Sequence, residues 1–430
     1  MKCHYACNSS EHLVARRTFM GALGASAAGS LVGGLGVFNR PASAAQLQSD
    51  QKRVVVFNMH GGLSQLESWD PKPGTDTGGP FRSIETSVPG VRISELLPHT
   101  AKQMHHVCLL RGVNTAEDDH AKGMYLMLTG RRQSPAAEYP NIGAVCAKAM
   151  APDSNPMPGH IVISPHKGGG RGNDAAYLGP MYSSLTLGDG MPPANMARPE
   201  QISEAMNNTR NAIRQRANER FLNRRRTAIT DAYVYSYEQA AKLVRQRDVF
   251  DVSREPAKDH DRYGRHDLGR HCLLARRLLE QGATFVQVTH SNYDTHNENF
   301  DFHIEQLGEF DIAFATFVAD IADRGMLDST LIVVLSEFGR TPNINLYYGR
   351  DHWSKAWTVL AAGGRIQRGG AFGKTSDNGT EVVDGQVDHA NLFHTYLQAV
   401  GVDSTDSFDI EGRDLPLADP ASKAIKEVLT

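Results

Sequence analysis

Short runs of consecutive apolar residues recur along the chain, and each one changes abruptly to glycine and charged residues. Runs of this kind, rich in β-branched side chains, are typical of strands buried on both faces of a parallel sheet. Between them lie segments whose apolar residues return every three or four positions, as on an amphipathic helix. This alternation predicts an α/β fold. Strands are expected at residues 53–58, 107–112, 160–164, 284–289, 331–335 and 357–361.

The helical segments between these runs differ in how clearly they are marked. The strongest apolar stripe follows the fourth strand and consists of Ile304, Leu307, Phe310, Phe314, Phe317 and Ile321. A further helix is expected to begin near the acidic residues 117–119, with His120 in the first turn, and to continue to Thr129-Gly130. Others are expected at residues 262–281 and after Asp388, which suits an N-cap. Residues 200–255 are strongly charged, with three arginines at 224–226, and are expected to form a helical insertion with a solvated face.

The N-terminal 44 residues have the pattern of a twin-arginine export signal. Arg16 and Arg17 precede a weakly apolar, glycine-rich run, and Ala42-Ser43-Ala44 forms an A-x-A cleavage site. The glycines make this run a poor membrane span, so we expect no stable membrane anchor. The interpretation predicts recognition by the twin-arginine translocation machinery, a mature domain of residues 45–430, and a periplasmic or extracellular location.

Charge and cysteine content narrow the classes of function. The formal charge of −3 becomes about −6 without the signal, and nucleic-acid binding is not expected from a mildly acidic chain because it depends on neutralising phosphates. Cys108, Cys146 and Cys272 remain after cleavage, and their wide spacing does not indicate a disulfide framework.

Titratable residues gather just after the predicted strands. His60 follows the first strand, Asp294 follows the fourth, and Glu337 and Arg340 follow the fifth. Since the carboxyl ends of parallel strands share one edge of a sheet, these residues are expected around a single cleft. Simpler interpretations are a structural histidine at position 60 and a local ion pair between Glu337 and Arg340 that fixes a turn.

Several segments together resemble a family of exported bacterial proteins of unknown function (domain-of-unknown-function family 1501) in the alkaline phosphatase and sulfatase clan. The segments are VVVFNMHGG, HAKGMYLMLTGRR, NYDTHNEN, SEFGRTPNIN, GRDHW and VDHANLFHTYLQAVG. The resemblance implies a three-layer α/β/α sandwich with a largely parallel central sheet and a metal-bearing cleft. The chain departs from the clan where His60 replaces a metal-binding Asp and His120 stands at the position of the sulfatase nucleophile.

Two interpretations of function follow. The first is a secreted metal-dependent hydrolase of phosphate or sulfate esters, with an anionic ester or a sulfated glycan as substrate. His120 would then be the general acid or base, and Arg340 would neutralise the ester. The ligands of one or two divalent cations, with zinc, manganese or iron favoured over calcium, would be His60, Asp294, His296, Glu337 and His352. The second interpretation is a degenerate clan member that binds a ligand or partner without turnover.

Overall fold

The computed structural model describes residues 51–430 except 153–154, 156, 166–168, 172, 192–199, 223–243 and 245. The expected export signal and the arginines at 224–226 therefore lie outside the described residues. No helix in the described part has the length and apolarity that crossing a bilayer requires.

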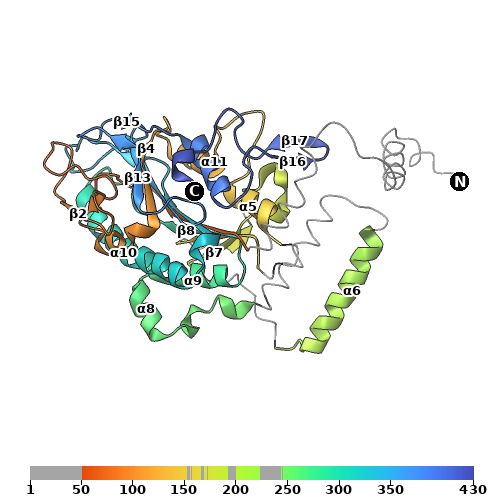
Figure 1. Ribbon diagram of the computed structural model, residues 1–430. Helices are drawn as coiled ribbons and strands as arrows, with labels where there is room; N and C mark the ends of the chain where they lie inside the picture. Colours follow the sequence, from red (N-terminus) through yellow and green to blue (C-terminus); the bar gives the residue numbers. More distant parts are fainter. Residues whose placement is uncertain are drawn as a thin grey trace. The chain divides into compact units, whose positions relative to one another are not determined.

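A nine-stranded sheet is the centre of the described fold (Figure 1). All six strands predicted from apolar runs belong to it. From one edge to the other the strands are β13 (Gly370–Phe372), β4 (Val107–Val113), β12 (Trp357–Ala362), β9 (Thr330–Leu335), β1 (Arg53–Met59), β8 (Phe285–His290), β5 (His160–Ser164), β7 (Leu185–Gly188) and β6 (Gly169–Arg171).

The strand directions place most carboxyl ends at one edge. β1 lies between β9 and β8 and is parallel to both, with Val56 opposite Val333 on one side and Gln287 on the other. β12 is antiparallel to both β9 and β4, so β4 runs in the same direction as β9. The loops that leave β1, β4, β8 and β9 therefore emerge together, which is the arrangement that forms ligand sites in open α/β sheets.

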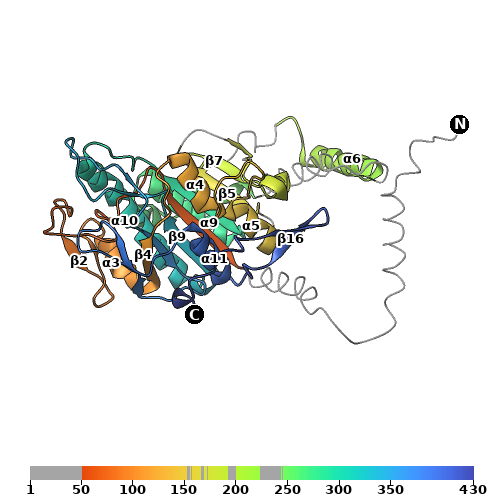
Figure 2. The same ribbon diagram turned by 90° about the horizontal axis from the view of Figure 1, so that it is seen from above.

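Helices cover both faces of the sheet and make it the middle layer of three (Figures 1 and 2). Alternate residues of β1 point to opposite faces: Phe57 packs edge-to-face on Phe314 and Phe317 of one layer, whereas Val56 belongs to the core on the other face. The Phe57 side carries α3 (Pro98–Gln103), α8 (Ala257–Tyr263), α9 (Asp267–Glu280) and α10 (Asn299–Asp323), and the other side carries α4 (His120–Thr129), α5 (Ile142–Met150) and α11 (His389–Ala399). The predicted three-layer sandwich is confirmed.

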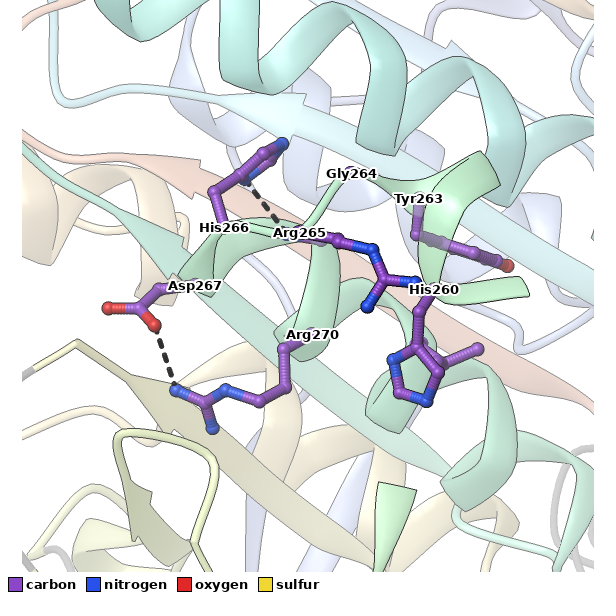
Figure 3. Close-up of a pocket in the computed structure, with 9 residues that line it drawn as sticks. His260, Tyr263, Gly264, Arg265, His266, Asp267 and Arg270 are labelled. Atoms are coloured by element: carbon purple, nitrogen blue, oxygen red, sulfur yellow. Dashed lines mark hydrogen bonds and ion pairs between the residues drawn. The ribbon is translucent and has the colours of Figure 1, made fainter. Parts of the chain in front are cut away.

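The prediction of one continuous helix at residues 262–281 is wrong. The segment expected as a single helix at 262–281 is divided into α8 and α9, because Gly264 adopts a φ of +86° that a right-handed helix does not allow. His266 then caps α9, its Nδ1 accepting a hydrogen bond from the backbone N–H of Gly269. Figure 3 shows the small pocket at this break, with Asp267 paired to Arg270.

The remaining elements are short, apart from α6 (Glu204–Leu222), which is the described helix of the predicted charged insertion. Asp388 caps α11 as predicted, accepting hydrogen bonds from Ala390 and Asn391. Two-stranded ribbons pair β2 (Ser83–Glu85) with β3 (Arg92–Ser94), β10 (Gly339–Arg340) with β11 (His352–Trp353), β14 (Lys374–Thr375) with β15 (Val382–Asp384), and β16 (Ser407–Ile410) with β17 (Arg413–Pro416).

Candidate metal centre

The loops after β1 and β8 touch at the carboxyl edge of the sheet. Gly61, the second residue after β1, has a φ of +116°, and a Cβ atom there would lie 2.5 Å from the backbone nitrogen of Asp294. Only glycine permits this approach. The glycine at position 61 therefore allows Asp294, which is distant in sequence, to lie against the end of the central strand.

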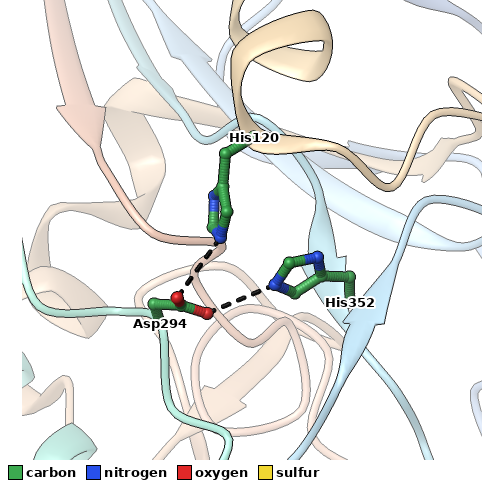
Figure 4. A group of neighbouring side chains, drawn as sticks. All are labelled: His120, Asp294 and His352. Carbon is green, nitrogen blue, oxygen red and sulfur yellow. Dashed lines mark hydrogen bonds and ion pairs between the residues drawn. The ribbon is translucent and has the colours of Figure 1, made fainter.

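Asp294 lies at the centre of a group of side chains that come from three elements (Figure 4). His120 begins α4, Asp294 follows β8, and His352 lies on β11; one donor atom from each lies within 4.8 Å of the others. Nε2 of His120 is 3.4 Å from Oδ2 of Asp294, and Nε2 of His352 is 3.3 Å from Oδ1. A carboxylate and two imidazoles thus converge.

His296 contacts the same group from the loop after β8. Its Nε2 is 3.1 Å from Oδ1 of Asp294 and 3.0 Å from Nε2 of His352. The side chains of His296 and Asp294 are 46% and 49% exposed, so this side of the group is open to solvent.

A buried carboxylate fixes the orientation of His120. Oε1 of Glu337 accepts hydrogen bonds from Nδ1 of His120 at 2.7 Å and from the backbone N–H of Gly61 at 2.9 Å, and the Glu337 side chain is fully buried. Burial raises the pKa of Glu337, but the hydrogen bond with His120 and the charge of His60 outweigh it, so the pKa lies below its ordinary value. An ionised acceptor places the proton of a neutral His120 on Nδ1 and leaves the lone pair on Nε2.

His352 and His296 are held in the same way. Nδ1 of His352 donates to the backbone oxygen of Asp118 at 2.7 Å, and Nδ1 of His296 donates to Oδ1 of Asp351 at 2.8 Å. A carbonyl oxygen only accepts hydrogen bonds, so the proton of a neutral His352 must be on Nδ1. Both Nε2 lone pairs then face the group.

This arrangement fits a divalent cation. Nε2 of His120 is buried without a hydrogen-bond partner, and Nε2 of His296 lies 3.0 Å from Nε2 of His352, where neither atom can donate to the other while both protons are on Nδ1. A cation held by Nε2 of His120, Nε2 of His352 and Asp294 relieves both conditions and leaves Nε2 of His296 beside it. Zinc–nitrogen bonds of about 2.0–2.1 Å in a tetrahedral site separate ligand atoms by about 3.3 Å, close to the distances between these atoms. Outer acceptors on each histidine are the usual support of metal-binding imidazoles.

Arg340 lies behind Asp294. Its Nη2 donates to Oδ1 of Asp294 at 2.6 Å, and other guanidinium hydrogens go to the backbone oxygens of Gly61, Gly62 and Arg350. Burial raises the pKa of Asp294, but the hydrogen bond and charge of Arg340 outweigh it and lower the pKa to about 2. Arg340 is fully buried, and its expected role of neutralising an anionic ester stays a prediction.

A second buried arginine shapes the loop between β10 and β11. Arg350 pairs with Glu67 at 2.8 Å, both side chains are fully buried, and Arg350 also donates to the backbone oxygen of Pro342. This ion pair fixes the loop that carries Asp351 and His352. No local pattern in the sequence predicts this ion pair, because 283 positions separate the two residues.

The comparison with known families decides the relationship. Residues 51–429 match the family described as "Protein of unknown function (DUF1501)". The chain belongs to this family. No curated protein matches it.

The three-layer fold of this DUF1501 protein has partial likenesses among solved structures. The lipoteichoic acid synthase LtaP from Listeria monocytogenes is 7% identical, with 87% of this chain and 80% of that chain covered and a TM-score of 0.39. The sulfatase PsFucS1 from Pseudoalteromonas sp. is 12% identical, with coverages of 85% and 72% and a TM-score of 0.37. The alkaline phosphatase from the Antarctic bacterium TAB5 is 14% identical, with coverages of 81% and 97% and a TM-score of 0.36.

The predicted residues of the DUF1501 site lie at different distances from the converging donor atoms. Asp294 and His352 are in the donor group and His296 touches it, whereas Glu337 lies behind His120. His120, expected as acid or base, is itself in the group. His60 is exposed beside it, its ring stacked 6.2 Å from that of His120, and is not one of the three converging donors. The roles of all these residues stay predictions.

Asp351 and Asp118 support the site but were not predicted to do so. Asp351 holds His296 through its carboxylate, and Asp118 holds His352 through its backbone oxygen. The adjacent Asp351-His352 pair in GRDHW was a signal for the first of these. Nothing in the sequence marks a backbone carbonyl as an acceptor, so the second required the structure.

Proposed function

We propose that this chain is an exported, metal-dependent hydrolase of phosphate or sulfate esters. The observation that carries the proposal is the convergence of imidazole Nε2 atoms on Asp294, with every Nδ1 bound from behind and one side open to solvent. Structural metal sites are closed by protein ligands, whereas catalytic sites keep a position open. His120, Asp294 and His352 would hold the cation. A cation bound there would polarise the ester and lower the pKa of water to about 7.

The chain's own residues would divide the remaining work. Arg340 keeps Asp294 ionised and oriented toward the histidines. Asp351 keeps the proton of His296 on Nδ1, so Nε2 is the atom that takes or gives a proton during the reaction. This assigns the acid–base role to His296, and His120 becomes a ligand positioned by Glu337.

Water is the proposed nucleophile because the described site presents no free hydroxyl or thiol. The Ser336 hydroxyl donates to the backbone oxygen of Met59 and accepts from the backbone N–H groups of Gly62 and Leu63. The three described cysteines are buried away from solvent. A covalent ester intermediate is therefore not part of the proposal.

A binding protein without turnover is the second candidate. The burial of Arg340 favours this candidate. Its guanidinium group donates hydrogen bonds to Asp294 and to backbone oxygens and is not exposed to an anionic ester. In this case the metal would anchor a ligand or partner.

Elemental analysis of residues 45–430, purified without chelator, tests the proposal, together with assays on aryl phosphates and aryl sulfates. A stoichiometric transition metal with ester turnover supports the hydrolase. Metal without turnover favours the binding protein, and absence of metal overturns the hydrolase.

His296→Gln then separates the two roles of that residue. Retained metal with lost turnover supports proton transfer, whereas loss of metal would identify His296 as a ligand that closes the site.

We also propose export through the twin-arginine pathway, supported by the paired arginines and the A-x-A site. Arg16→Lys together with Arg17→Lys should trap the precursor inside the cell, as fractionation and immunoblotting would show. Exported protein that still begins at Met1 would contradict cleavage after Ala44.

A further inference from the structure

The loop between β10 and β11 exposes three consecutive apolar side chains. Leu346, Tyr347 and Tyr348 are 95%, 72% and 71% exposed, more than any other large hydrophobic residue in the described part of the chain; Ile213 follows at 62%. Single exposed apolar residues need no explanation, but adjacent ones mark interaction sites.

This loop is held in place against the segment that carries His296. The backbone oxygens of Tyr347 and Tyr348 accept hydrogen bonds from the N–H groups of Glu298 and Asn299, each at 3.0 Å. The Asn345 side chain donates to the backbone oxygen of His296 at 2.8 Å. The backbone of this loop is therefore fixed beside the segment that carries His296, and its apolar side chains are exposed there.

Two further features connect the loop to the centre. A Cβ at Gly349 would collide with the backbone oxygen of His296, so the loop lies directly on that segment. Tyr348 has a φ of +56°, a left-handed conformation that bulky side chains rarely adopt and that is concentrated at functional sites. The fold maintains an unfavourable backbone conformation where it exposes an aromatic ring.

We propose that Leu346, Tyr347 and Tyr348 form a stacking surface for a carbohydrate ring that bears the anionic ester. This inference rests on the proposed function, which places the ester at the metal centre. Tyrosine combines a flat apolar face with a hydroxyl, as a sugar combines C–H faces with hydroxyls. The exposed side chains of Glu298 and Asp351 lie on the segments that flank the loop and can accept hydrogen bonds from sugar hydroxyls.

Other occupants fit less well. A lipid surface is bound by a larger aliphatic area than this loop supplies, since Leu346 is the single aliphatic residue of the three. A stable protein interface buries about 800 Å² on each partner, more than three adjacent side chains supply.

Glycan binding by the metal-loaded mature protein tests this inference without requiring turnover. The probe is an array of neutral and sulfated oligosaccharides, followed by calorimetric titration of the best ligand. Tyr347→Ser with Tyr348→Asn removes both rings, and asparagine tolerates the left-handed conformation. Ile213→Ser is the matched control, an exposed aliphatic residue on α6.

Loss of both rings should weaken glycan affinity by about tenfold or more, while metal content and the control variant stay at wild-type values. Absence of glycan binding by the wild type, or equal affinity in the double variant, would overturn the inference. So would ring-dependent binding to phosphatidylcholine–phosphatidylglycerol vesicles, or ring-dependent dimerisation, without glycan binding.

The outcome is separate from that of the proposed hydrolysis. Ring-dependent glycan binding without ester turnover would keep this surface and reject the hydrolase. Turnover of small aryl esters without glycan binding would do the reverse.

Discussion

Two clusters of charged residues in this protein have opposite designs. In the first, between α8, α9 and α10, Oδ2 of Asp320 accepts hydrogen bonds from Arg276 at 2.9 Å and from the Tyr263 hydroxyl at 3.0 Å, while Oδ1 accepts from Arg262. Asp320 and Arg276 are almost completely buried. Each of these hydrogen bonds pairs a donor with an acceptor and connects two of the three helices.

In the candidate metal centre, acceptors meet acceptors. Asp294 faces Nε2 of His120, His296 and His352, and these atoms are lone pairs when the imidazoles are neutral and their protons lie on the Nδ1 atoms that contact Glu337, Asp351 and Asp118. Asp294 is also half exposed. Both clusters are dense in titratable groups, so density alone does not distinguish a structural network from a functional site. The two kinds of cluster are distinguished by the atoms that point inward, because converging lone pairs are stabilised by a bound cation whereas paired donors and acceptors are not.

Breaking the helix network should have the largest effect on stability. Asp320→Asn removes the most deeply buried carboxylate that Arg276 and Arg262 share and leaves them with the less buried Glu255 and Asp259. We therefore expect the free energy of unfolding to fall by about 3–5 kcal/mol. Urea denaturation measures this, with Glu305→Gln, an exposed acid on α10, as control. Metal content per folded molecule should not change; a stable Asp320→Asn variant that lost metal would remove the distinction between the clusters.

Asp294→Asn should affect binding more than folding. We expect metal affinity to fall by about 100-fold or more, because the central anionic ligand is lost. Apo-protein stability should fall by only about 1–2 kcal/mol, since Arg340 keeps its backbone acceptors. Competition with a chromophoric chelator gives the affinity. Unchanged affinity would place any bound metal elsewhere.

Glu337 and Asp351, the carboxylates that accept hydrogen bonds from Nδ1 of His120 and of His296, allow a finer comparison within the candidate metal centre. Glu337→Gln should weaken metal binding by about 10–100-fold, because it no longer fixes a strongly basic Nε2 on His120. Asp351→Asn should have a smaller effect on affinity and a larger effect on turnover if His296 transfers protons. Equal losses of affinity in both variants would instead indicate that His296 is a ligand.

Acid should separate the two clusters. Burial raises the pKa of Asp320, but hydrogen bonds from Arg262 and Arg276 lower it below the ordinary value of 3.8. Its contribution to stability is therefore complete above that value and lost as the pH falls toward the depressed folded pKa. Protons compete with metal for histidine, and the hydrogen bond with Glu337 raises the pKa of His120 above its ordinary value, so metal should leave well before the helices separate. Metal release and far-UV circular dichroism that change together on acidification would contradict this order.

The smallest effect is expected for an exposed ion pair. Arg265 and Asp261 are 2.7 Å apart on the surface and are 65% and 61% exposed. Asp261→Asn should change the free energy of unfolding by at most about 0.5 kcal/mol, since water screens both charges. A loss comparable to that of Asp320→Asn would show that burial is not what separates the two cases.

The sequence by itself determined the layers of the fold and the edge where the site lies. Apolar runs such as Leu331–Leu335 and the stripe of α10 record burial over neighbouring positions, which is local information. The motifs identified the family, and the strand ends located Asp294, His296 and His352. The same periodicity failed at Gly264, because a continuous apolar pattern does not register a break between two helices that pack on the same face.

Only the tertiary structure decided what each side chain does. It turned His120 toward Asp294, placed Glu337 behind it, buried Arg340, and paired Glu67 with Arg350 across 283 positions. Burial periodicity gives the face on which a residue lies. It does not give the direction of a ring in a loop, because partners from distant segments, and the proton that they fix on one nitrogen, set that direction.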